Sequence, residues 1–183
     1  MDLKLCTSNE GKRREFERIL GVSLALEDVE LDEIQSVDTE AVCRAKAALA
    51  YAKVGQPVLV DDTGFELVEL GNFPGALVTW ALGAGGLEVL HRMLPSGVAA
   101  TAAAVTCIGL ADETGVRVFT GRVSGTVLSA PRGVGGFGFD PVFVPDGQSR
   151  SLAEMDDEEK DQHSPRGFAL AKLSDYLAAG RRV

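Results

Sequence analysis

The feature that most constrains the fold is a short, uninterrupted apolar run, Val58-Leu59-Val60, which ends at two adjacent carboxylates, Asp61 and Asp62. Gly55 and Pro57 stop a helical pattern just before it. A short apolar run without alternation is typical of a strand that is buried on both faces. Strands of this kind belong to α/β proteins, so the run indicates that fold class.

The rest of the chain alternates between strand-like and helix-like segments. Strands are expected at residues 3–6, 24–31, 58–60, 100–110, 116–128 and 141–145, and helices at 12–20, 38–53, 76–94 (one or two) and 164–180. Asp38 or Thr39 is expected to cap the second of these helices. Asp112-Glu113-Thr114-Gly115 predicts a hairpin whose turn is longer than two residues. Because no repeat, linker or low-complexity segment interrupts this order, we expect one mixed α/β domain over residues 1–183.

The charge balance excludes some kinds of partner. The chain has 27 acidic and 18 basic residues, a formal charge of −9. Affinity for nucleic acid depends on many Lys and Arg contacts with phosphates, so a nucleic-acid partner is not expected. A small anionic ligand stays compatible with this charge if the acidity is local and a metal ion intervenes.

The sequence also bears on location and on cysteine chemistry. Its first residues turn polar too early for a signal peptide, and no apolar run approaches the roughly 18 to 20 residues of a membrane span. We therefore expect a cytoplasmic protein with no membrane partner. Cys6, Cys43 and Cys107 are far apart, as are His91 and His163, so the cysteines are interpreted as buried apolar residues rather than as disulfide or zinc ligands.

Two lysines are candidates for binding an anion. Lys12 ends the small, polar stretch from Thr7, where a helix begins, and helix N-termini can hold phosphate; the alternative is a surface turn with a solvated lysine. Lys46 shares the i, i+3, i+4, i+7 stripe of Val42, Ala45 and Leu49. A lysine on this inward stripe must either extend outward to solvent or meet an anion.

Asp61 and Asp62 end the predicted strand, where open α/β sheets form crevices. Adjacent carboxylates repel each other unless a cation joins them, and Mg²⁺ uses one or two carboxylates together with substrate phosphate. The alternative is a turn in which these side chains accept hydrogen bonds from local backbone N–H groups.

The glycine-rich run from Gly133 to Gly138 matches the dinucleotide pattern G-x-G-x-x-G only formally, because Asp140 and Pro141 follow instead of a helix. Phe137 and Phe139 in this region could stack on a nucleotide base. Their alternative interpretation is two ordinary core residues.

Together these segments resemble the inosine triphosphate pyrophosphatase (Ham1-like) family along nearly the whole chain. The matching segments, in order, are Thr7-Ser8-Asn9-x-x-Lys12 for the family's T-G-N-x-x-K, Asp32-Glu33-Ile34-Gln35, Arg44-Ala45-Lys46-Ala47, Val58-Leu59-Val60-Asp61-Asp62-Thr63-Gly64, Phe73-Pro74-Gly75, Phe137-Gly138-Phe139-Asp140-Pro141, and finally Ala153-Glu154-Met155, Glu159-Lys160 and Ser164-Pro165-Arg166-Gly167. Any one of them is weak, but their common order makes a chance match improbable.

The resemblance implies an elongated mixed sheet flanked by helices, with two lobes around a central active-site cleft, and a homodimer. It implies Mg²⁺-dependent hydrolysis of inosine or xanthosine triphosphates, in ribo or deoxy form, to the monophosphate and pyrophosphate, a nucleotide-pool house-cleaning reaction. Asp62, Lys12 and Lys46 would be catalytic, with Asp62 the general base, and Glu33, Asp62 and Asp61 would hold the metal. The implied substrate-binding residues are Thr7, Ser8, Asn9, Lys12, Thr63, Phe137, Gly138, Phe139, Asp140, Lys160, Ser164 and Arg166, with Lys160 donating to a 6-oxo group.

Two positions depart from the family pattern. Ser8 replaces a glycine, which predicts a backbone angle that serine accepts less readily. Pro165 replaces a histidine that contacts the base, while Ser164 can cap the helix that Pro165 begins. These changes leave two alternatives open: the same reaction on another modified or pyrimidine nucleotide, and a non-catalytic nucleotide sensor. The carboxylates and both lysines argue against the sensor.

Overall fold

The computed structural model describes residues 3–94 and 100–180, and within them the chain forms a seven-stranded mixed sheet. The strand order is β2-β1-β3-β5-β6-β7, with β4 paired to β3; β1 is parallel to β2 and β3, and the other pairs are antiparallel. The strands are β1 (Lys4–Leu5), β2 (Ala25–Leu26), β3 (Val58–Leu67), β4 (Pro74–Gly75), β5 (Thr101–Asp112), β6 (Gly115–Val127) and β7 (Phe143–Pro145). The helices are α1 (Glu10–Leu20), α2 (Thr39–Val54), α3 (Val78–Gly85), α4 (Glu88–Arg92), α5 (Asp157–His163) and α6 (Pro165–Gly180), with short 3₁₀ turns at Val68–Leu70, Asp140–Val142 and Leu152–Glu154.

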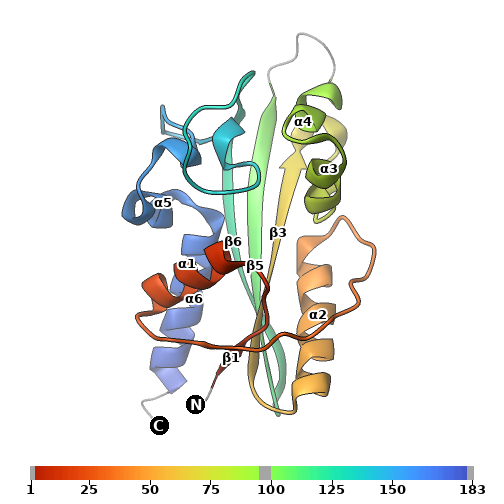
Figure 1. Ribbon diagram of the computed structural model, residues 1–183, viewed down its shortest axis with the longest axis vertical. Helices are drawn as coiled ribbons and strands as arrows, with labels where there is room; N and C mark the ends of the chain where they lie inside the picture. Colours follow the sequence, from red (N-terminus) through yellow and green to blue (C-terminus); the bar gives the residue numbers. More distant parts are fainter. Residues whose placement is uncertain (1–2, 95–99, 181–183) are drawn as a thin grey trace.

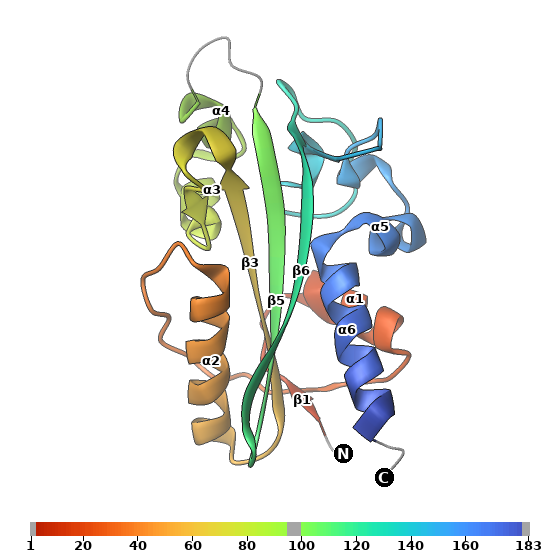
Figure 2. The same cartoon turned by 180° about the vertical axis from the view of Figure 1, so that it is seen from behind.

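The long strands β3, β5 and β6 run the length of an elongated molecule, with helices on both sides (Figure 1). Figures 1 and 2 show α2 on one side of these strands and α1 with α6 on the other, all three beside the lower half of the strands. Helices α3 and α4 lie toward the upper end of the same strands. The predicted fold class, a mixed sheet flanked by helices, is confirmed.

The alternation of side chains along β3 determines what each face of the sheet can bury. Leu59 packs with Phe16 and Leu170 on the face covered by α1 and α6. Val60 packs with Cys43 on the face covered by α2. A third apolar cluster lies toward the end of the sheet near α3 and α4. The apolar run is therefore buried on both faces, as predicted.

Local capping explains where the helices begin. Asn9 accepts a hydrogen bond from the Lys12 backbone N–H at the start of α1, and Asp38 caps α2, as predicted. Ser164 Oγ accepts a hydrogen bond from Gly167 N, and Pro165 is the first residue of α6. The predicted arrangement of Ser164 and Pro165 is thus confirmed.

Three predicted boundaries are wrong. The strand expected at 24–31 covers only Ala25–Leu26. The strand expected to end at Val60 continues to Leu67, because β5 hydrogen-bonds to it along this whole stretch. Asp112 pairs with Gly115, so the hairpin turn has two residues rather than more. Helix α5 was not predicted.

The remaining predictions about the fold concern the backbone at Ser8, the cysteines and membrane-spanning helices. Asn72 is the only non-glycine residue in the described ranges with a positive φ, at 72°, so the predicted difficulty at Ser8 is not present. All three cysteines are buried free thiols, as expected. None of the helices within residues 3–94 and 100–180 is long and apolar enough to cross a membrane.

Candidate active site

A cleft of about 1080 Å³ contains all of the predicted site residues in its lining. Its volume is slightly above the roughly 300–1,000 Å³ typical of small-molecule sites. The N-terminal loop, the loop before α2, strand β3, helix α3 and the glycine-rich loop all contribute to its walls. The predicted residues that line it are Thr7, Ser8, Asn9, Lys12, Glu33, Lys46, Asp61, Asp62, Thr63, Phe137, Gly138, Phe139, Asp140, Lys160, Ser164 and Arg166.

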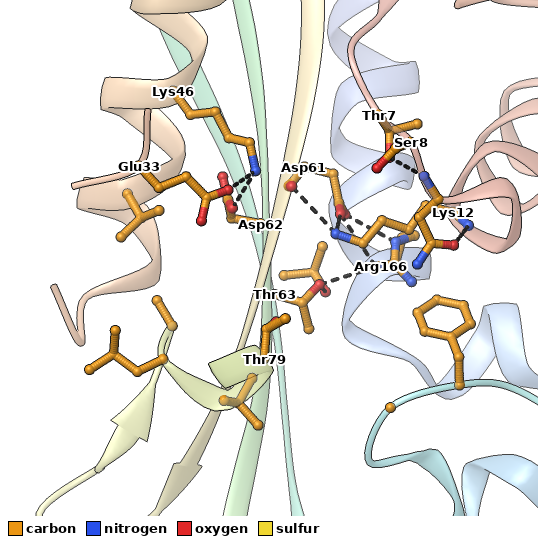
Figure 3. A pocket seen from close by; sticks show the side chains of 18 of the residues that line it. Thr7, Ser8, Lys12, Glu33, Lys46, Asp61, Asp62, Thr63, Thr79 and Arg166 are labelled. Carbon is orange, nitrogen blue, oxygen red and sulfur yellow. Dashed lines mark hydrogen bonds and ion pairs between the residues drawn. The ribbon is translucent and has the colours of Figure 1, made fainter. Parts of the chain in front are cut away.

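Strand β3 divides the charged groups of this cleft into two sets. Because successive side chains on a strand point to opposite faces, Asp61 and Asp62 diverge. Figure 3 shows Asp61 with Lys12 and Arg166 on one side of the strand and Asp62 with Lys46 and Glu33 on the other. The two carboxylates therefore lie in the middle of a strand, on opposite faces, and form ion pairs with different side chains.

Asp61 is completely engaged by cations. Its Oδ2 accepts from Arg166 Nε at 3.0 Å, and its Oδ1 forms an ion pair with Lys12. Burial alone would raise the pKa of Asp61, but the Arg166 and Lys12 charges outweigh burial and hold that pKa well below its usual range. Both oxygens of Asp61 thus have cationic partners, and its role as a metal ligand stays a prediction.

Asp62 keeps one oxygen unpaired. Its Oδ1 accepts from Lys46 Nζ at 3.0 Å, whereas Oδ2 is buried and has no hydrogen-bond partner among the described residues. Burial raises the pKa of Asp62 to about 6, despite the opposing effect of Lys46. A carboxylate that has a pKa of about 6 and one unpaired oxygen is suited to accept a proton or to bind a metal ion.

Lys46 joins Asp62 to Glu33. Its Nζ lies 2.5 Å from Glu33 Oε1, on the loop before α2. Burial disfavours the ammonium, but the carboxylates of Asp62 and Glu33 outweigh that effect and raise the pKa of Lys46. Of the two alternatives for this inward-facing lysine, the structure shows the one in which it meets anions.

The loop before α1 forms another wall of the cleft. Thr7 Oγ1 accepts from Asn9 N at 3.2 Å, and Asn9 Oδ1 accepts from Lys12 N at 3.1 Å. These bonds hold a short polar turn at the N-terminus of the 11-residue helix α1. Its partial positive charge and Lys12 together make this wall favourable for an anion.

A buried ion-pair network forms beside the glycine-rich loop. Lys160 Nζ lies 2.8 Å from both Glu15 Oε1 and Asp140 Oδ2, and Arg166 Nη1 lies 2.5 Å from Glu15 Oε2. Asp140 Oδ2 also accepts the backbone N–H of Phe137 at 2.8 Å. Since Arg166 also binds Asp61, the network connects β3 to the glycine-rich loop.

Several of the predicted residues in and beside this network are almost completely buried. Asp140, Lys160 and Arg166 are each only 5% exposed, so they line a deep, largely buried part of the cleft. Phe139 is 6% exposed and stacks on Phe65 at 4.4 Å between ring centroids, so most of its ring belongs to the core. Phe137 is the more accessible of the two phenylalanines.

Thr63 and Glu15 complete this part of the site. Thr63 Oγ1 accepts from Arg166 Nη2 at 3.1 Å. Glu15 was not among the predicted site residues, and its partner Lys160 is 145 residues away. The available signal was its helical spacing: Glu15 lies four residues before Ile19, on the buried side of the helix.

The fold and the site define a mixed α/β protein whose central cleft combines an anion-binding helix N-terminus, buried lysines and a partly unpaired carboxylate. The family model described as "Ham1 family" matches residues 3–176. The chain belongs to the Ham1 family, as its motifs predicted.

Several named relatives align over most of this chain. The "Inosine triphosphate pyrophosphatase 1" of Trypanosoma cruzi is 42% identical over 178 residues, covering 94% of this chain and 90% of the relative. The "dITP/XTP pyrophosphatase" of Saccharolobus solfataricus is 37% identical over 174 residues, covering 93% and 91%.

Solved structures agree with this assignment. The Ham1 protein of Staphylococcus aureus superposes with a TM-score of 0.84 at 25% identity, covering 97% of this chain and 99% of that one. The "Nucleoside-triphosphatase / dITP/XTP pyrophosphatase" of Mycobacterium abscessus has a TM-score of 0.73 at 28% identity, with all of both chains covered.

Proposed function

We propose that this protein is a Mg²⁺-dependent nucleoside triphosphate pyrophosphatase that hydrolyses non-standard purine nucleotides, such as inosine and xanthosine triphosphates, to the monophosphate and pyrophosphate. The observation that carries the proposal is Asp62: a buried carboxylate with a raised pKa and an unpaired oxygen, beside Lys46 in a cleft that also contains Lys12. The names of the relatives support the reaction and the substrate class.

The cations of the cleft suit a triphosphate. Lys12 and the turn at the N-terminus of α1 are available to bind its oxygens on one side of β3, and Lys46 is available on the other. Phosphoryl transfer depends mostly on positioning and on neutralising charge, and two lysines on either side of the strand can supply both. Negative charge collects on the pyrophosphate as it leaves.

Asp62 and Glu33 fit a magnesium site. Both carboxylates contact the Lys46 ammonium, so they lie close together, and Asp62 Oδ2 is available for a further ligand. Within the described ranges, no three or more His, Cys, Asp or Glu side chains form a metal-binding group. Mg²⁺ suits two carboxylates because substrate phosphates and water complete its coordination. When bound, the ion would neutralise phosphate charge and help to position the attacking water.

Asp62 is the proposed general base. A base is most effective when its pKa lies near the working pH, and in the metal-free protein burial raises the pKa of Asp62 to about 6. The carboxylate would accept a proton from the water that attacks the α-phosphorus. Lys46 holds the other carboxylate oxygen and so fixes the orientation of the side chain.

The network beside Phe137 is the proposed base site. Phe137 offers an accessible ring for stacking, and Lys160 lies close to it. An ammonium has three N–H donors, and Glu15 and Asp140 accept two of those on Lys160, which leaves one for a 6-oxo group. Adenine presents an amine donor at that position, so the network would be left with an unpaired donor.

The test is pyrophosphate release from a panel of nucleoside triphosphates with Mg²⁺, using wild-type protein and Asp62→Asn. We expect inosine or xanthosine triphosphate to react well ahead of adenosine triphosphate, and the substitution to remove most of the activity. Binding without turnover by the wild-type protein would instead favour the nucleotide sensor. A fully active Asp62→Asn variant would remove Asp62 from the reaction.

A second candidate keeps the reaction and changes the base. Pro165 lines the cleft where the family pattern has histidine, and a proline side chain donates no hydrogen bond. This favours a broader range of bases, including other modified nucleotides or pyrimidine nucleotides. Comparable rates on purine and pyrimidine triphosphates would support it.

A further inference from the structure

The ring of Phe137 lies between two parts of the molecule that come from distant sequence positions. Lys160 Nζ is 4.6 Å from the ring centroid and Arg166 Cζ is 5.2 Å from it. The same ring lies against the first turn of α1, next to Gly11. Phe137 therefore links the buried cations of the proposed base site to the helix that begins at the proposed phosphate site.

Gly11 leaves just enough space for this contact. A methyl group on its Cα would lie 3.2 Å from both Cδ1 and Cε1 of Phe137, and 3.1 Å from Asn9 Oδ1. Such contacts are tighter than ordinary van der Waals contacts, so the ring or its surroundings would have to move by a few tenths of an ångström.

The backbone at Gly11 does not itself require glycine. Gly11 lies inside α1, and its φ is not among the positive values found at other glycines. Glycine inside a helix is less favourable than alanine, because it loses more conformational freedom on folding. The close approach of Phe137 and of Asn9 Oδ1 is thus the structural reason for a glycine at this position.

We propose that Gly11 is a positioning residue for base recognition: its missing side chain lets Phe137 lie against α1 and sets where that ring stands relative to Lys160 and Arg166. The inference deepens the proposed function and rests on it. Gly11 acts through Phe137, so substitution should weaken the hold on the base while the phosphate groups and Asp62 stay in place.

The first test compares Gly11→Ala with wild type in steady-state hydrolysis and in product inhibition. We expect KM for inosine triphosphate to rise by about fivefold to tenfold while kcat changes less than about twofold, since Asp62 and its partners are untouched. The inhibition constant of inosine monophosphate should rise with KM, whereas that of pyrophosphate, which has no base, should not.

The matched control is Gly83→Ala. Gly83 is an exposed glycine of α3 with no atom within 4 Å of the position of a new methyl group. Alanine should raise the urea midpoint of unfolding there, through helix propensity, and should leave KM unchanged. An equal rise of KM in this variant would mean that the effect is not specific to Gly11.

A double-mutant cycle with Phe137→Leu separates the effect of the contact with the Phe137 ring from that of the contact with Asn9, which caps α1. If Gly11 acts through Phe137, the Gly11→Ala effects on KM and on the unfolding midpoint should largely disappear when Phe137→Leu is already present. Effects of the same size with and without Phe137→Leu, or a parallel rise in the pyrophosphate inhibition constant, would assign them to Asn9 and Lys12 and overturn the proposal. If the wild-type protein releases no pyrophosphate, the proposed function fails. The unfolding midpoints test the contact between Gly11 and Phe137 separately: additive shifts of the midpoint in Gly11→Ala and Phe137→Leu would show that the two residues do not interact.

Discussion

Replacing Asp62 by asparagine should stabilise this protein while removing its turnover. Asp62 is buried, its side chain is 11% exposed, and one of its oxygens has no hydrogen-bond partner among the described residues. Lys46 attracts the charged form, but burial has the larger effect and the pKa rises from 3.8 to about 6. Ionised Asp62 therefore lowers the free energy of unfolding of this protein.

The size of the effect follows from this shift. Two pKa units at about 1.4 kcal/mol each amount to about 3 kcal/mol of folding free energy. Because the folded pKa is the raised one, the stability due to protonated Asp62 is complete below about pH 4 and is lost as the pH rises through about 6. Asparagine resembles the protonated acid, so its advantage should reach up to about 3 kcal/mol at pH 8 and vanish near pH 4.

The assay is urea unfolding of wild type and Asp62→Asn in metal-free buffer at pH 8, 6 and 4, with pyrophosphate release measured in parallel. Asp61→Asn is the matched control, since it removes a neighbouring carboxylate whose pKa is lowered instead. Loss of Asp61 leaves Lys12 and Arg166 without a shared anion and should destabilise the protein by several kcal/mol at pH 8. If Asp62→Asn were also less stable at pH 8, or if its advantage persisted at pH 4, the argument from burial would be refuted.

Three further predictions concern the network, the metal and the base. Glu15→Gln should cost about 3 to 5 kcal/mol in urea unfolding, because Lys160 and Arg166 lose a buried anion; a loss under about 1 kcal/mol would contradict a structural role for this network. Removing divalent ions with a chelator should stop pyrophosphate release and leave the far-ultraviolet circular dichroism unchanged, and added Mg²⁺ should restore activity; turnover that survives chelation would exclude the metal. Pro165→His should increase the ratio of kcat/KM for inosine over adenosine triphosphate, since it adds a hydrogen-bonding group to the cleft wall, and an unchanged ratio would show that this position does not select the base.

The sequence alone was sufficient for most of the secondary structure. The apolar run Val58–Val60 predicted a strand that is buried on both faces, and the helices that cover it were predicted from apolar spacing and caps. Asp38 and Ser164 cap their helices as expected. These features depend on neighbours a few residues apart, so their physical causes are present within a short segment of chain.

The ends of the strands and their pairing partners could not be predicted from neighbours a few residues apart. The end of β3 depends on β5, which hydrogen-bonds as far as Leu67, and local polarity at Asp61 and Asp62 wrongly suggested an earlier end. With the strand continued, the alternation of side chains separates the two carboxylates onto opposite faces. The expectation that a cation would join the two carboxylates assumed that they lie together at the end of a strand.

The sequence by itself determined the family, the mixed α/β fold class and a set of site residues that all line the cleft. Only the tertiary structure decided their partners: Asp61 is neutralised by Lys12 and Arg166, whereas one oxygen of Asp62 has no partner within residues 3–94 and 100–180 and its pKa is raised. The physical reason is that burial and ion pairing depend on the whole fold. Glu15 meets a lysine 145 residues away, and local spacing carries no information about such a contact.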